Sequence, residues 1–163
     1  MNVVNGLPAH VLLVHFMVVL VPLTALLEIA CALWPPARRG QLVWLTLILA
    51  LVTTVLTPIT TNAGGWLYDL TRNPDPILRE HAERGGTMIY FSVALLVGAI
   101  VLVALHFAEP QSGKGRRITN IVIAVVVLAV GVSSMIQIYR VGDAGSQSVW
   151  GNEIARLKKA NGT

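Results

Sequence analysis

The chain has few of the residues on which soluble enzymes and disulfide-rich domains depend. Only 12% of its 163 residues are charged, whereas 55% are hydrophobic; a soluble domain carries about twice that charged fraction. The single cysteine, Cys31, excludes an internal disulfide and a paired-cysteine metal site. So many apolar residues cannot all be buried in one small core. We therefore predict that the protein lies in a membrane.

Four apolar runs are each long enough to span a bilayer, which takes about 20 helical residues. Because backbone polar groups in lipid must be satisfied within their own segment, each run is predicted to be a helix. The runs cover approximately residues 11–34, 42–61, 88–107 and 118–139, and a tail follows over 140–163. The predicted fold is all-α, a multi-pass four-helix bundle that forms one domain over residues 1–163.

Positive charge is spread unevenly over the connections between these runs. Residues 35–41 and 108–117 are rich in Lys and Arg, whereas residues 62–87 mix acidic and basic side chains. Lys and Arg accumulate on the cytoplasmic side of membrane helices. The first and third connections are therefore predicted to be cytoplasmic, with both termini on the outer, periplasmic side. We therefore attribute the formal net charge of +4 to the orientation of the protein in the membrane, and we expect no nucleic-acid partner.

Small and mildly polar residues form stripes at helical spacing in two of the runs. Such stripes mark helix contacts in membranes, where close backbone approach replaces the hydrophobic effect. We predict that they face the bundle interior and that their hydroxyls bond carbonyls of their own helix. The stripes consist of Thr53, Thr57, Thr60, Thr61 and Gly64 in the second run, and of Asn120, Ala124, Val127, Gly131 and Ser134 in the fourth.

Ionisable residues near the membrane are functional candidates, because their burial in lipid is costly. His10, His15 and His81 are expected to converge at the outer leaflet, although His10 and His15, about 140° apart around a helix, do not share one face. Two imidazoles from different helices can hold haem b or a metal ion. In the simpler interpretation, each histidine bonds a loop carbonyl or carboxylate and caps the bundle, and no metal or cofactor is bound.

A second polar centre is expected toward the cytoplasmic leaflet, where Glu28 and His106 lie. Glu28 is either a proton-relay carboxylate or a structural partner of His106 or Arg38. Structural pairing is favoured, because the other three spans hold no second acid for a relay. In the tail, Trp150, Ile154 and Leu157 recur at helical spacing beside basic residues. This weakly amphipathic pattern suits the membrane surface or a partner protein.

No combination of residues points to catalysis. The sequence contains no nucleophile-and-base arrangement, no phosphate-binding glycine loop and no zinc protease motif. The protein is therefore expected to be a non-enzymatic membrane protein, with no catalytic residues.

Four landmarks carry a resemblance to a known family. They are the stretch from Gly6 to Phe16, Gly64-Gly65-Trp66, Glu80-His81-Ala82, and the stretch from Arg140 to Gly151. Together they resemble a family of small four-helix bacterial membrane proteins classified only as a domain of unknown function. The family has proline where this chain has Ala9 and Met17. The resemblance implies a location in the bacterial plasma membrane.

In size, topology and general character the chain is also similar to the prokaryotic respiratory supercomplex association factors of actinobacteria. This resemblance implies a non-catalytic accessory subunit that contacts lipids and the subunits of a cytochrome bc and cytochrome oxidase assembly. The tail residues Trp150, Ile154 and Leu157 would then bind the partner. The alternative is a redox membrane protein that binds haem b or interacts with quinol through the outer histidines His10, His15 and His81.

Overall fold

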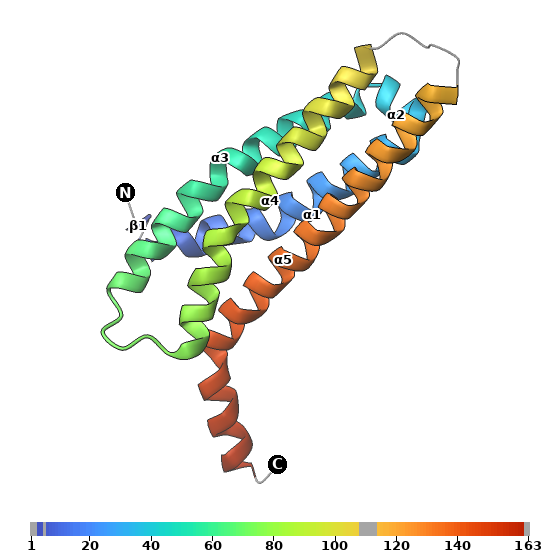
Figure 1. Ribbon diagram of the computed structural model, residues 1–163. Helices are drawn as coiled ribbons and strands as arrows, with labels where there is room; N and C mark the ends of the chain where they lie inside the picture. Colours follow the sequence, from blue (N-terminus) through green and yellow to red (C-terminus); the bar gives the residue numbers. More distant parts are fainter. Residues whose placement is uncertain (1–2, 5, 108–113, 162–163) are drawn as a thin grey trace.

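The structure, a computed structural model, describes residues 3–4, 6–107 and 114–161 and consists almost entirely of helices (Figure 1). Four long helices contain segments apolar enough to cross a membrane: α1 (Ala9–Leu33), α3 (Leu42–Asp69), α4 (Pro76–Phe107) and α5 (Lys114–Ala160). The short α2 (Pro35–Arg39) links α1 to α3, and β1 (Val3–Val4) pairs with β2 (Leu7–Pro8) ahead of α1. The predicted all-α membrane bundle is confirmed.

The four long helices form a ring in the order α1, α3, α4, α5. Each packs against its two neighbours, and α1 also touches α4 across the ring. The end of the bundle where α1 begins, α3 ends, α4 begins and α5 emerges is called the outer end, after the predicted topology. The C-terminal part of α5 projects beyond the other helices at this end (Figure 1).

The predicted small-residue stripes lie in the interior. Thr53, Thr57 and Thr60 on α3 and Val127 and Ser134 on α5 are buried. The hydroxyls of Thr57, Thr60 and Ser134 donate to the carbonyls four residues earlier in their own helices, over 2.7–2.8 Å. These three hydroxyls are therefore satisfied within their own helices, whereas the buried hydroxyl of Thr53 bonds that of Thr24 on α1 at 3.4 Å.

The helices at the outer end are longer than the apolar runs predicted. α3 continues past residue 61 to Asp69, α4 begins at Pro76 and not at residue 88, and α5 continues through the predicted tail to Ala160. The helix α4 runs without interruption through Gly85 and Gly86. Glycine costs about 1 kcal/mol in a helix, and contacts between helices at the outer end outweigh this cost. Residues 108–113 of the third connection lie outside the described residues.

The topology can be tested by labelling single cysteines in a Cys31→Ala background on intact cells. Gly40, Asn73 and Glu153 are exposed, the first at the inner end of the bundle and the others beyond the outer end. A membrane-impermeant maleimide should label Asn73→Cys and Glu153→Cys directly, and Gly40→Cys only after permeabilisation. Labelling of Asn73→Cys and Glu153→Cys from opposite sides would contradict the four-span arrangement.

Candidate functional site

His10, in the first turn of α1, is docked onto the outer end of α3. Its Nδ1 donates a hydrogen bond to the carbonyl oxygen of Thr60 at 2.9 Å. The ring lies over Gly64, four residues further along α3, where an added Cβ would be 2.8 Å from His10 Cε1 and Nδ1. A carbonyl oxygen has two lone pairs, so it can accept from the ring as well as from its own helix. Glycine at position 64 is what lets the imidazole reach it.

His81, near the start of α4, is docked onto α5 in the same way. Its Nδ1 donates to the carbonyl oxygen of Val141 at 2.9 Å. The ring lies over Gly145, again four residues after the acceptor, where a Cβ would be 2.9 Å from His81 Cε1. Both histidines are half-buried. One local arrangement therefore occurs twice, once in each helical hairpin.

The structure brings His10 and His81 together and leaves His15 apart. The ring centroids of His10 and His81 are 6.0 Å apart, with the ring planes at 79°. His15 is exposed, and its Nδ1 bonds the carbonyl of Val11 in its own helix at 2.6 Å. The expectation that three histidines converge is therefore wrong for His15, because its position on α1 faces away from the bundle. Among the described residues, no group of three metal-ligating side chains is found.

The two docked histidines occupy equivalent positions in an internal repeat. A shift of 71 positions takes His10 on α1 to His81 on α4. The same shift pairs buried positions of the two helices along their whole length, namely Met17 with Met88, Val21 with Ser92, Thr24 with Leu95, Glu28 with Ala99, and Cys31 with Leu102.

The partner helices α3 and α5 are related by a second shift, of 81 positions, which takes Thr60 to Val141 and Gly64 to Gly145. It also aligns Asn62-Ala63-Gly64 with Asp143-Ala144-Gly145. Six buried pairs follow this shift: Thr46 with Val127, Ala50 with Gly131, Thr53 with Ser134, Thr57 with Ile138, Thr60 with Val141, and Ala63 with Ala144. Because both hairpins start at the outer end, the bundle consists of two parallel repeats about an axis along its length. His10 and His81 meet at the outer end of that axis.

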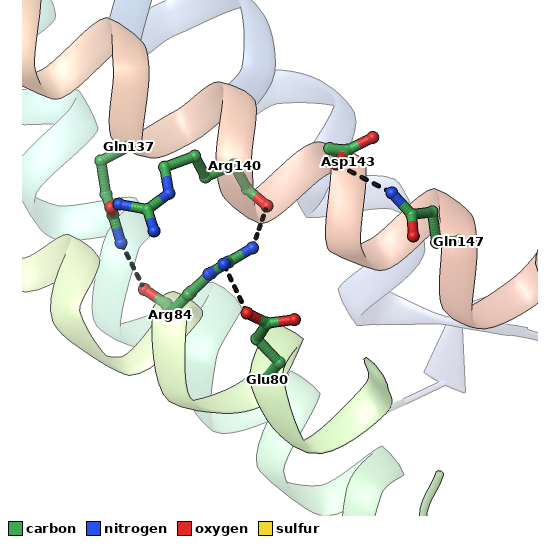
Figure 2. A network of polar contacts seen from close by, with 6 residues as sticks. All are labelled: Glu80, Arg84, Gln137, Arg140, Asp143 and Gln147. Carbon is green, nitrogen blue, oxygen red and sulfur yellow. Dashed lines mark hydrogen bonds and ion pairs between the residues drawn. The ribbon is translucent and has the colours of Figure 1, made fainter. Parts of the chain in front are cut away.

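Polar contacts around His81 hold α4 and α5 together (Figure 2). Arg84 pairs with Glu80 one turn earlier and donates to the carbonyl of Arg140 at 3.5 Å. Gln137 donates from Nε2 to the carbonyl of Arg84 at 3.2 Å and to the hydroxyl of Thr87 at 2.9 Å. On the next turn of α5, Gln147 donates to Asp143 at 2.9 Å. These contacts keep α4 helical through its two glycines.

At the inner end His106 makes a third contact with a backbone carbonyl. Its Nδ1 donates to the carbonyl of Arg38, in α2, at 2.9 Å. The ring also packs edge-on against Trp44 and Phe107, with centroids 6.1 and 5.3 Å away. His106 therefore closes the inner end of the bundle and does not contact Glu28 by a hydrogen bond.

Glu28 is fully buried, and neither carboxyl oxygen has a hydrogen-bond partner among the described residues. The predicted structural pairing of Glu28 with His106 is therefore wrong, because His106 bonds a backbone carbonyl instead. The carboxyl group lies against Gly98 of α4, where an added Cβ would be 2.8 Å from Oε2. The repeat has Ala99 where α1 has Glu28, so among the described residues this pair of positions places one carboxyl group, and not two, in the interior.

The sequence patterns did not reveal two features of the site. The carbonyl acceptors Thr60 and Val141 carry no chemical signal, because any residue has a carbonyl group. Gly64 and Gly145 lie in two of the four landmarks that carry the family resemblance. Their position beneath the imidazole rings could be recognised only once the packing of the helices was known. The repeated Asn-Ala-Gly and Asp-Ala-Gly tripeptides, at 62–64 and 143–145, are the sequence signal from which the duplication could have been found.

Gly98→Ala is expected to destabilise the bundle by about 1–3 kcal/mol, because the new methyl group must displace the buried Glu28 side chain. Gly86→Ala is the matched control on α4, since a Cβ there meets nothing within 4 Å, and it should be neutral or stabilising by up to about 1 kcal/mol. Thermal unfolding of the purified protein in mild detergent measures both. An unchanged midpoint for Gly98→Ala would contradict the tight contact between α1 and α4.

Comparison with known proteins agrees with this architecture. The model of the family described as "Predicted membrane protein (DUF2231)" matches residues 6–157, nearly the whole chain. No curated protein and no solved structure matches the chain. The matched region includes both docked histidines, both platform glycines and all four long helices except the last three residues of α5, and the chain belongs to the DUF2231 family of predicted membrane proteins.

Proposed function

We propose that the protein is a non-catalytic accessory subunit of a membrane-embedded respiratory electron-transfer assembly, which it contacts through the projecting part of α5. The main support for this proposal is an apolar stripe on the part of α5 that projects beyond the bundle. Trp150, Ile154 and Leu157 are 60%, 50% and 54% exposed. They recur at helical spacing, and Val149 beside them is also exposed.

The projecting helix is well suited to a protein partner. Exposed apolar patches outside a lipid-facing belt mark interaction surfaces, and a tryptophan is often the residue that dominates an interface. The stripe is separated from the apolar span by the polar segment 142–148, so it begins beyond the bundle. The basic residue Lys158 flanks it. We expect the partner to offer an apolar groove with acidic residues along its rim.

The respiratory assignment draws on the resemblance to supercomplex association factors, and the partners proposed are cytochrome bc and cytochrome oxidase subunits. The interior supports an accessory role, because the buried hydroxyls of Thr46, Thr57, Thr60 and Ser134 bond carbonyls of their own helices. A bundle of this kind serves better as a scaffold than as a pump.

Trp150→Ala is expected to lower co-purification with respiratory complexes about tenfold or more, because it removes the largest side chain of the stripe. Lys159→Ala is the control, since position 159 lies on the opposite side of the helix from Trp150 and is exposed. Both are measured by quantitative mass spectrometry of material extracted from native membranes in mild detergent. Recovery of respiratory subunits that does not change in Trp150→Ala, or their absence from the wild-type preparation, would refute the proposal.

A further inference from the structure

The paired histidines at the outer end have a definite protonation pattern. A backbone carbonyl oxygen can only accept, so Nδ1 of both His10 and His81 must carry the donated proton. In the neutral ring Nε2 then holds a lone pair. Neither ring can donate to the other, because each Nδ1 proton is already used. Two acceptor nitrogens therefore belong to rings whose centroids are only 6.0 Å apart.

We propose that His10 and His81 are the two protein ligands of a single transition-metal centre, bound through their Nε2 atoms at the outer end of the repeat axis. A histidine that ligates a metal almost always donates its other ring N–H to a carbonyl or carboxylate, which fixes its tautomer and orientation. Both histidines already make this second bond, to Thr60 and Val141. The site goes beyond the proposed accessory role and does not depend on it.

The repeat explains why two ligands would act on one centre. In transporters built from internal repeats, substrate and ion sites lie at the interface between the repeats. His10 and His81 are repeat-equivalent and are held by equivalent contacts, so the same nitrogen, Nε2, is left without a carbonyl partner in both rings. Two imidazoles on opposite sides of a metal, with bonds of about 2.0 Å, have ring centres about 6 Å apart. The observed 6.0 Å fits this requirement.

The surroundings restrict the kind of metal. Among the described residues no cysteine or carboxylate joins the pair to form a group of three ligands, and the nearby Glu80 is paired with Arg84. A structural zinc site, which takes four protein ligands, is therefore disfavoured. Imidazole is a suitable ligand for iron and for copper. The proposed metal is therefore one that accepts two imidazole ligands. It is either the iron of a haem, whose porphyrin supplies the other ligands, or a copper ion.

The glycine platforms give the proposal a test that leaves both histidines in place. Gly64→Ala puts a methyl group 2.8 Å from the His10 ring, whereas a Cβ at the adjacent Gly65 meets nothing within 4 Å. Likewise Gly145→Ala encounters the His81 ring, and Gly142→Ala does not. If the rings are metal ligands, the first variant of each pair should weaken metal binding and its control should not.

The experiment uses the full-length protein, expressed in a bacterial membrane and purified in mild detergent. Bound copper and iron are measured by mass spectrometry, and haem by its absorption spectrum after dithionite reduction. The metal-free protein is also titrated with haemin and with Cu(I). Wild-type protein should bind one of these in a single site per chain. His10→Gln and His81→Gln should each lower the affinity about tenfold or more, with His15→Gln unchanged.

The two titrations distinguish haem iron from a copper ion. A Soret band identifies haem, and bound copper without a Soret band identifies the copper ion. Size-exclusion profiles and helical circular dichroism show whether each variant is folded. If a histidine variant does not fold, the Gly64→Ala and Gly65→Ala pair decides the question. Failure of the folded wild-type protein to bind haemin or copper would overturn the site, as would equal binding by the folded histidine variants and wild type. A protein that binds metal but does not co-purify with respiratory subunits would refute the proposed accessory role and leave the proposed metal site standing.

Discussion

The outer end of the bundle depends on two backbone carbonyl oxygens, those of Thr60 and Val141, each of which accepts a hydrogen bond from a histidine on the neighbouring helix. Each contact needs glycine one turn later, because a side chain there would occupy the space of the imidazole. The contacts fix how far α1 and α4 extend along their partners. They also keep both helical hairpins ordered beyond the apolar spans, where lipid no longer favours a helix.

The internal repeat gives these contacts a common axis. His10 and His81 are brought together because α1 and α4 occupy equivalent places in the two hairpins and touch across the ring. The repeat is not symmetric at every level. Glu28 on α1 corresponds to Ala99 on α4, and the carboxyl group fits against the interior only because Gly98 lies beside it. Two imidazoles, those of His10 and His81, therefore lie at the outer end of the bundle, and the buried carboxyl group of Glu28 lies further in.

The spans and their inward faces could be predicted from the sequence because they rest on local properties. Twenty apolar residues in lipid must form a helix, and the positions of Thr53, Thr57 and Ser134 follow from helical periodicity alone. The helix ends could not be predicted, since they depend on contacts between residues 50 or more positions apart, such as His10 with Thr60 and His81 with Val141. The exposure of His15 and the lack of a bond from His106 to Glu28 likewise depend on how the helices are rotated against one another.

Nδ1 of both outer histidines carries a proton, because each is hydrogen-bonded to a backbone carbonyl, which can only accept. This protonation is tested most directly by ¹⁵N solid-state NMR of histidine-labelled protein in lipid bilayers, with the signals assigned by comparison with His10→Gln and His81→Gln. We expect a protonated Nδ1 in each of the two rings and, in the neutral form of the ring, an Nε2 that carries no proton. A proton on Nε2 of either ring, with Nδ1 unprotonated, would contradict this expectation.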